Sequence, residues 1–160
     1  MRRIVLTALL VNSLTVAGCS DRAPAPAGSD DKKAVIMARR DHMKAQTAAM
    51  SAIKSYLNGD TDQAAAQKSA DSLVRLARAL PDQFPPGTST ADFPGVSGAM
   101  PAIWVEKDKF SLAEETMTAE AEKLAAAIKS GDKKAAADQY INAGWNGCNN
   151  CHTAFRLRLN

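Results

Sequence analysis

Apolar side chains recur every three to four residues in four long segments of the chain, a pattern that helices with one buried face produce. The first segment stops before Gly59 and the second before Pro81, two residue types that commonly end helices. The second segment is expected to begin at a cap formed by Asp60 or Thr61. The inward positions of the first segment are Ile36, Met43, Met50, Ile53 and Leu57, and those of the second are Ala66, Ala70, Leu73, Ala77 and Leu80.

The second half of the chain repeats this pattern twice more. The third segment closes at Gly131, and the fourth begins at Asp132 and runs nearly to the C-terminus. Ala, Lys, Glu and Gln are frequent while β-branched and aromatic residues are scarce, which favours helix over strand. The inward positions of the third segment are Phe110, Ala113, Met117, Leu124 and Ile128, and those of the fourth are Ala137, Tyr140, Ile141, Gly144, Cys148, Cys151, His152 and Phe155.

The connections between the segments predict how they pack. Residues 58–60 and 130–132 are short turns, and short turns make the helices that they join antiparallel neighbours. Residues 81–109 hold five of the seven prolines, so they form a long crossing loop. The expected fold class is all-α, an antiparallel four-helix bundle with a long loop between its second and third helices. Alanine lines much of the core, and a large apolar prosthetic group would fill the space that such small side chains leave.

The first 33 residues do not share the helical pattern. Residues 1–18 begin with two arginines after Met1 and continue as a short apolar stretch, which is typical of an export signal. The stretch is shorter than the roughly 20 apolar residues of a permanent membrane span. Residues 19–33 contain Ala-Pro-Ala-Pro-Ala-Gly-Ser and are interpreted as a flexible tether. Residues 34–160 remain as the globular domain.

Cys19 has two interpretations. Small residues directly before it form the pattern of a bacterial lipoprotein signal, in which the cysteine is acylated and anchors the protein to a membrane surface. The alternative is an ordinary signal cleaved near Ala17 or Gly18, which would leave Cys19 as a lone thiol. A lone thiol is uncommon in an oxidising compartment, and this favours lipid attachment.

The net charge gives no case for binding to nucleic acid. The chain has 20 basic and 17 acidic residues, and removal of Arg2 and Arg3 with the signal leaves 18 against 17. A nearly balanced domain lacks the excess of positive charge that nucleic-acid binding proteins carry.

Cys148-Asn149-Asn150-Cys151-His152 is the most specific motif of the chain. A Cys-x-x-Cys-His sequence is a covalent haem-attachment site, in which the thiols bond to the two vinyl groups and the imidazole binds the iron. Residues three and four apart on a helix share a face, so all three side chains can reach one cofactor. The motif predicts one covalent haem c with His152 as an iron ligand.

Two other uses of these cysteines fit less well. A thioredoxin-like Cys-x-x-Cys lies at a junction of strand and helix, and no strand is predicted here. A zinc site would need a further ligand, but the other Cys and His residues are Cys19, in the predicted anchor, and His42. The export signal also agrees with haem attachment, which takes place outside the cytoplasmic membrane.

The second iron ligand decides what the iron can do. Three inward methionines are available: Met43, Met50 and Met117. An inward methionine commonly only fills core, and this is the interpretation of Met50 and Met117. Met43 differs because Arg39 and Arg40 lie one turn or less away, where a cation can meet a haem propionate. His42 lies about 100° round the helix from Met43 and is expected to face solvent.

Together these features resemble class II cytochromes c, the cytochrome c′ superfamily, and in particular its low-spin cytochrome c-556 branch. The resemblance covers about residues 34–156. The sequence Cys-His-Thr-Ala-Phe-Arg at 151–156 is similar to the family's Cys-His-x-x-(Tyr/Phe)-Arg. Arg39-x-x-x-Met43-Lys44 is similar to its Arg-x-x-x-Met-Lys, although Arg40 stands where the family commonly has Gln.

The long loop carries the third match, and the resemblance extends to its aromatic residue. Phe-Pro-Pro-Gly at 84–87 and Met-Pro-Ala-Ile-Trp at 100–104 are similar to the family's Phe-Pro-x-Gly and Leu-Pro-Ala-Ile-Trp. Trp104 is expected to pack near the haem edge, with a plain loop anchor as the alternative. Arg156 is expected to contact a propionate or the haem edge, and its alternative is a solvated arginine that favours the helix dipole.

The resemblance implies a left-handed antiparallel bundle with the haem near one end. In the low-spin branch the residue that matches Met43 is the sixth iron ligand, which implies His152/Met43 ligation here. In the high-spin branch that position is Leu, Phe or Tyr, and the vacant face of the haem binds nitric oxide or carbon monoxide.

The expected function is therefore one-electron transfer in the periplasm, without enzymatic activity. A six-coordinate iron leaves no position for a substrate, and methionine ligation raises the haem potential. The alternative is a five-coordinate protein that binds nitric oxide or carbon monoxide, with Met43 packed but not bonded. Expected partners are redox proteins of a respiratory or photosynthetic chain and, through Cys19, a membrane surface. Class II relatives often form homodimers, but no stripe here is apolar enough to require one.

Overall fold

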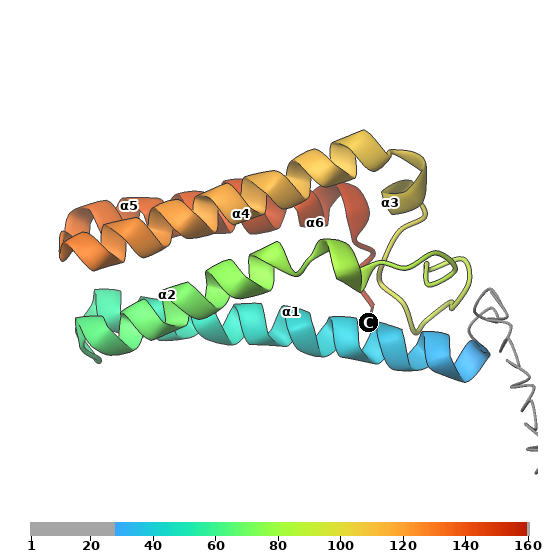
Figure 1. Ribbon diagram of the computed structural model, residues 1–160, viewed down its shortest axis with the longest axis horizontal. Helices are drawn as coiled ribbons and strands as arrows, with labels where there is room; N and C mark the ends of the chain where they lie inside the picture. The colour runs from blue at the N-terminus through green and yellow to red at the C-terminus, as the bar shows by residue number, and fades with distance from the viewer. Residues whose placement is uncertain (1–27, 160) are drawn as a thin grey trace, which may run out of the picture.

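The computed structural model of the chain describes residues 28–159. The predicted signal, Cys19 and residues 19–27 of the predicted tether lie outside this range. Three long helices and a fourth composite segment form the molecule (Figure 1). They are α1 (Ser29–Asn58), α2 (Gln63–Arg78), α4 (Lys107–Ser130) and the run of α5 (Lys133–Asn142), η2 (Ala143–Asn149) and α6 (Asn150–Phe155). The expected antiparallel four-helix bundle is confirmed.

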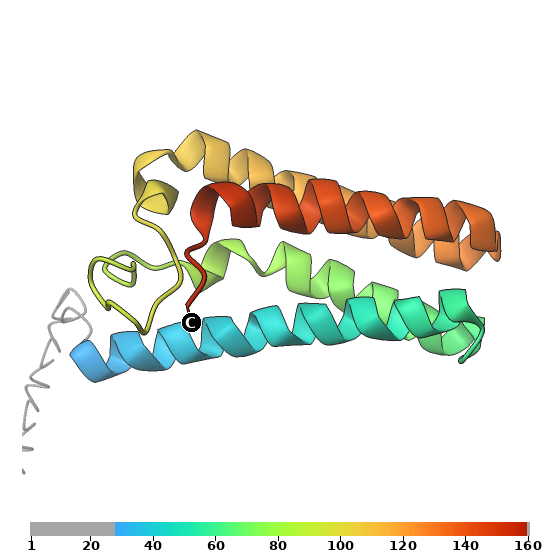
Figure 2. The same cartoon turned by 180° about the vertical axis from the view of Figure 1, so that it is seen from behind.

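The helices stack as two hairpins. Figures 1 and 2 show α1 and α2 in one layer, with α4 and the fourth segment above them. α2 packs against both α1 and α4, and α4 packs along α5 and η2. The long loop lies at one end of the bundle and contains two short turns, η1 (Pro81–Gln83) and α3 (Ala102–Val105). Within residues 28–159 no helix has the length and apolar character needed to cross a bilayer.

The helix ends follow local chemistry, with one correction to the sequence analysis. Gly59 ends α1 in the left-handed region, at φ 92°, which glycine adopts without strain. The cap of α2 is Asp62, whose carboxylate accepts a hydrogen bond from Ala65 N at 2.8 Å, so the expectation of Asp60 or Thr61 is wrong. The chain needs those two residues to complete the turn after Gly59. The fourth segment begins at Asp132 as expected, and Asp132 caps α5 by accepting from Ala135 N at 3.0 Å.

Helix α1 starts earlier than the predicted domain boundary. It begins at Ser29 and so includes the last five residues of the segment interpreted as a tether, 29–33. Asp30 and Asp31 lie in its first turn. Negative charge there stabilises the partial positive charge of a helix N-terminus, which explains a start in a segment of low hydrophobicity.

The fourth segment is not a uniform α-helix. Its middle part, η2, is π-helical and carries Cys148 near its end. In α5 and η2, the buried positions Ala136 and Ala143 lie seven residues apart, about two turns. Ile141 falls on the other side and is 66% exposed, so its predicted inward position is wrong.

The core has two parts. The larger one runs from the end with the short turns to the middle of the bundle, and its fully buried side chains include Ile53, Leu73, Leu124 and Ile128. The predicted inward positions of the second and third segments are all buried. In α1, Ile36 and Ile53 are buried, whereas Met43, Met50 and Leu57 are partly buried. The smaller part lies under the long loop, where Phe110 packs edge-on against Phe84 and Phe155 at centroid distances of 4.9 and 5.1 Å.

A short bridge ties the long loop to the end of the chain. Ala99 and Arg156 form an isolated antiparallel β-bridge. Met100 N donates to Phe155 O at 2.9 Å, and Leu157 N donates to Gly98 O at 2.9 Å. The residues that follow α6 are therefore fixed beside the loop.

Candidate haem site

A large cavity opens at the loop end of the bundle. Its volume is about 930 Å³, at the upper end of the roughly 300–1,000 Å³ that is usual for cofactor and ligand sites. Side chains from α1, α4, the fourth segment and the C-terminal residues line it, and most of the lining is apolar. The structure brings six of the predicted site residues to this cavity: Cys148, Cys151, His152, Met43, Arg39 and Arg156.

Cys148 and Cys151 reach the cavity from two kinds of helix. Cys148 lies in the π-helical turn η2, and Cys151 lies in α6. Burial raises the pKa of Cys148, and burial, Glu114 and Cys148 together raise the pKa of Cys151 to about 11. Both side chains are therefore neutral thiols at neutral pH.

Gly147 lets η2 lie close against α4. A side chain at this position would place its Cβ 2.9 Å from Met117 Sδ, too close for real atoms. Cys148 Sγ then lies 3.8 Å from Met117 Sδ. Met117 is thus a packing partner of the motif itself, in line with its interpretation as core, and it lies on the cysteine side of the cavity.

His152 is held in the form that binds metals. Burial lowers its pKa, and the nearby charges of Arg156 and Arg158 lower it further. A low pKa keeps the imidazole neutral, with a nitrogen lone pair free for a metal ion. The side chain is partly buried and lines the cavity.

Met43 lines the same cavity from α1, in the other layer of the bundle (Figures 1 and 2). Its side chain is partly buried. Met50 lines the cavity as well, two turns farther along α1. The two methionines are therefore both placed across from the motif, and only their distance from the loop end separates them.

Arg39 makes contacts that the sequence did not predict. The residue is only 5% exposed. Its guanidinium donates hydrogen bonds at 2.9–3.2 Å to Gln83 O, to Thr88 Oγ1 and Thr88 O, and to Ser97 Oγ. It also lies over the Phe84 ring at 5.0 Å. All of these partners belong to the long loop, so Arg39 fastens that loop to α1 at the cavity wall.

Two other predicted side chains lie beside the cavity and do not line it. Trp104 donates from Nε1 to Phe84 O at 3.0 Å, which is the loop-anchor arrangement. His42 was expected to face solvent, and this is wrong: it is partly buried between α1 and α2. Its Nε2 lies 2.9 Å from Leu76 O and 3.1 Å from Gln46 Nε2. The close α1–α2 contact brings the Leu76 carbonyl within reach.

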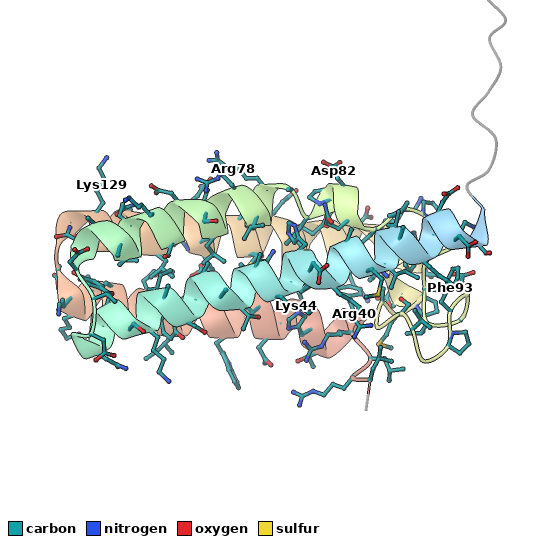
Figure 3. The ribbon with its side chains drawn as sticks, turned by 90° about the horizontal axis from the view of Figure 1, so that it is seen from below. Arg40, Lys44, Arg78, Asp82, Phe93 and Lys129 are labelled. Carbon is teal, nitrogen blue, oxygen red and sulfur yellow. The ribbon has the colours of Figure 1, made fainter. Side chains whose placement is uncertain are left out.

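The mouth of the cavity is basic. Its exposed cations are Arg40, Lys44, Arg156 and Arg158. Figure 3 shows Arg40 and Lys44 next to each other on α1. Lys44 pairs with Asp41 at 2.8 Å, and the other three have no ion-pair partner among residues 28–159. Such a rim suits the two propionates of a haem, and the apolar walls suit its ring. The chain's own residues thus fit this cofactor.

Sequence reasoning missed two polar side chains of the cavity, Gln46 and Glu114. Both are buried and line it. Burial raises the pKa of Glu114 to about 7, and the nearby Glu115 contributes. The signal was present: Glu114 lies four residues after Phe110 and three before Met117, on the inward stripe of α4.

Comparisons with known proteins show the family of the chain. The family model described as Cytochrome C′ matches residues 34–156. Cytochrome c-556 of Agrobacterium tumefaciens is 32% identical over 123 residues, which cover 75% of this chain and 94% of the relative. Cytochrome c′ of Rhodospirillum rubrum is 28% identical over 156 residues, or 98% and 99% of the two chains. A solved cytochrome c′ from Rhodobacter spheriodes matches with a TM-score of 0.70 at 28% identity, covering 79% of this chain and 98% of that one.

Proposed function

We propose, because this chain belongs to the cytochrome c′ family, that it is a one-electron carrier with His152 and Met43 as its two iron ligands. It is a haem protein of that family, and its two cysteines at the cavity are Cys148 and Cys151. When bound there through thioether bonds, the haem supplies the Fe(III)/Fe(II) couple. The chain's own residues bind it, orient it and set its surroundings.

One observation supports the ligand assignment, and the family resemblance favours Met43 over Met50, which lines the same cavity. His152 and Met43 line a single cavity from helices in different layers of the bundle. The lowered pKa of His152 favours the neutral imidazole that binds metal ions. The thioether of Met43 binds a metal ion without losing a proton. An iron held by both residues would have no position left for a substrate, which suits a carrier.

The other cavity residues support electron transfer in different ways. The apolar walls exclude water, and burial of a haem in such surroundings is one of the means by which proteins set its potential. The exposed Arg40 and Arg156 can pair with the propionates. Arg39 acts at one remove, since its hydrogen bonds hold the loop that closes this end.

The proposal includes a place in the cell. Proteins of this family are typically periplasmic, and the signal-like residues 1–18 agree with export. Cys19 would then anchor the protein to a membrane by its lipid, so that the tether holds the haem domain near redox partners embedded there. A homodimer through the helical faces is compatible with this arrangement.

The alternative is a gas-binding protein, and relatives named cytochrome c′ as well as cytochrome c-556 keep it in view. The two proposals differ in whether Met43 bonds to the iron. If Met43 packs in the cavity without bonding to iron, the iron is five-coordinate and open to nitric oxide or carbon monoxide.

The visible spectrum of the reduced protein, with and without carbon monoxide, tests the proposal. We expect a sharp low-spin α-band that carbon monoxide leaves unchanged. Met43→Ala should convert it to a broad high-spin spectrum that responds to carbon monoxide. Met50→Ala is the matched control, because Met50 lines the same cavity from the same helix.

Two outcomes would contradict the proposal. A high-spin, carbon monoxide-sensitive spectrum of the unmodified protein would support the gas-binding alternative. A change of spectrum in Met50→Ala but not in Met43→Ala would identify Met50, two turns farther along α1, as the iron ligand. Haem stain that survives denaturing electrophoresis checks the thioether bonds separately, and its loss in Cys148→Ala/Cys151→Ala is the control for that measurement.

A further inference from the structure

Glu114 is a buried carboxyl group inside the proposed haem cavity. It lies on α4 and is 8% exposed. Its Oε1 atom is fully buried and has no hydrogen-bond partner among residues 28–159. A buried polar atom without a partner costs free energy, and glutamine or a small apolar residue could occupy a core position at lower cost. Binding and release of a proton would explain a carboxyl group at this buried position.

Glu114 also borders a second hollow, on the outside of the bundle between α2 and α4. This hollow has a volume of about 410 Å³ and includes Arg78, Ser111 and Thr118 in its lining. Within the described part of the chain, Glu114 is the one residue that lines both the hollow and the haem cavity. Figure 3 shows Arg78 at the upper edge of the view, whereas the cavity-mouth residues Arg40 and Lys44 lie below the centre, on α1. Glu114 therefore lies between the haem cavity and this outer hollow.

Charged and titratable groups from several elements line the haem cavity or the outer hollow together with Glu114. On α4 the neighbour is Glu115, and on α2 it is Arg78, which is paired with Glu122 at 2.6 Å. α6 contributes Cys151, a thioether position and not an iron ligand, and His152, which is uncharged when it binds iron. The cations that line the cavity are Arg39, Arg40, Lys44, Arg156 and Arg158. Burial raises the pKa of Glu114, and the nearby Glu115 raises it further.

We infer that Glu114 binds one proton when the haem iron accepts one electron, so that this protein carries a proton together with its electron. The balance is simple: the oxidised protein with ionised Glu114, one electron from the redox donor and one proton from water give the reduced protein with protonated Glu114. Oxidation by the acceptor returns both. The inference rests on the haem attachment of the proposed function and does not depend on Met43.

The direction of the coupling follows from charge. A ferric haem carries one more positive charge than a ferrous haem, and a positive charge inside the same cavity favours the ionised carboxylate. Reduction removes that charge and so raises the pKa of Glu114. Because the pKa already stands near 7, proton uptake falls in the range of physiological pH. Linkage then requires the reduction potential to fall as pH rises.

The reduction potential as a function of pH tests this inference. We expect the potential to fall between about pH 6 and pH 8, with a slope that approaches tenfold in the reduction equilibrium per pH unit, or about 59 mV for one electron. Glu114→Gln keeps the shape of the side chain without a titrating proton and should lose most of that slope. Glu115→Gln is the matched control, since it removes the same charge at the exposed neighbouring position. It should keep the slope but move it to lower pH, because Glu115 helps to raise the pKa of Glu114. Equal slopes in wild type and Glu114→Gln would overturn the inference.

A second measurement needs no variant. The reduced-minus-oxidised infrared difference spectrum of the wild-type protein should show a protonated carboxyl C=O band that appears on reduction and shifts in heavy water. Absence of this band at a pH where the potential is sloping would place the proton elsewhere and refute the role of Glu114. The visible spectrum of the same sample reports iron ligation. A failure of the Met43 assignment can therefore be told apart from a failure of the proton coupling.

Discussion

The two ends of the bundle are made of similar helices but are closed in different ways. At the end with the short turns, Gly59 and Gly131 reverse the chain, and Leu124 and Ile128 are fully buried among apolar neighbours. At the loop end, a cavity of about 930 Å³ separates the helices. Polar contacts hold its walls, and two charged residues, Arg39 and Glu114, are buried there.

This difference teaches how a small-residue bundle makes room for a large cofactor. Close packing specifies the first end by volume, because each side chain fills space that another leaves. A cavity cannot be specified in that way, so the second end relies on directional bonds such as those of Arg39 to Thr88 and Ser97. The end with the short turns should therefore lose stability when a buried side chain is truncated, and the loop end when a hydrogen-bond donor is removed. Three substitutions test this difference.

Leu124→Ala should have the largest effect. Leu124 is fully buried in the larger core, and truncation of such a leucine lowers the free energy of unfolding by about 2–5 kcal/mol. Denaturant unfolding measures the loss, and the haem spectrum should stay unchanged. Leu112→Ala on the same helix is the control, because Leu112 is 64% exposed and should change stability by no more than about 0.5 kcal/mol. A shifted haem spectrum in Leu124→Ala would mean that the two ends are not independent.

Arg39→Ala should come next, and its effect should be concentrated at the loop end. Removal of the guanidinium takes the donor from buried Thr88 Oγ1 and leaves Thr88 O and Ser97 Oγ with one donor each, Ser97 Oγ and Ala99 N. The expected cost is about 1.5–3 kcal/mol. Limited proteolysis should cut within residues 84–101 before the bundle unfolds. Arg39→Lys should recover only part of the loss, since an ammonium group cannot reproduce the planar fork. If the exposed Arg40→Ala matches the loss, the loop contacts are not its cause.

Asp62→Ala should have the smallest effect of the three. It removes the acceptor for Ala65 N at the start of α2 and should lower the free energy of unfolding by about 1 kcal/mol. Asp60→Ala is the matched control, because Asp60 lies in the turn and caps nothing. An equal loss in both variants, measured by thermal or denaturant unfolding, would show that charge near the helix end matters more than the cap.

The sequence predicts the packed end better than the cavity end. Helical periodicity located the buried positions of α2 and α4, because a continuous stripe repeats its signal over several turns. The π-helical turn that carries Cys148 was not predicted, because its seven residues are too few for a repeating pattern of apolar residues to reveal a change of period. Ile141 was wrongly assigned an inward position because several apolar residues in α5 compete for the inward face.

At the cavity, the sequence identified residues that belong to the site but did not predict which residues contact one another. The haem motif identifies Cys148, Cys151 and His152 by spacing alone. The partners of Arg39 lie 44 to 58 positions away in the loop, and no local pattern predicts such contacts. Glu114 was overlooked because a glutamate on a helix is usually solvated, although its position on the stripe of Phe110 and Met117 was visible.

The bridge between Ala99 and Arg156 has a consequence for the order in which the molecule assembles. The two residues are separated in the chain by the whole of α4 and the fourth segment. Contacts across so long a separation form late, because the entropy of closing a long loop opposes them. Each helical hairpin, by contrast, can form from neighbouring residues. The cavity should therefore remain open during folding until the last residues arrive. The two thiols would then be accessible to an incoming haem before the residues after α6 fasten the loop beside them.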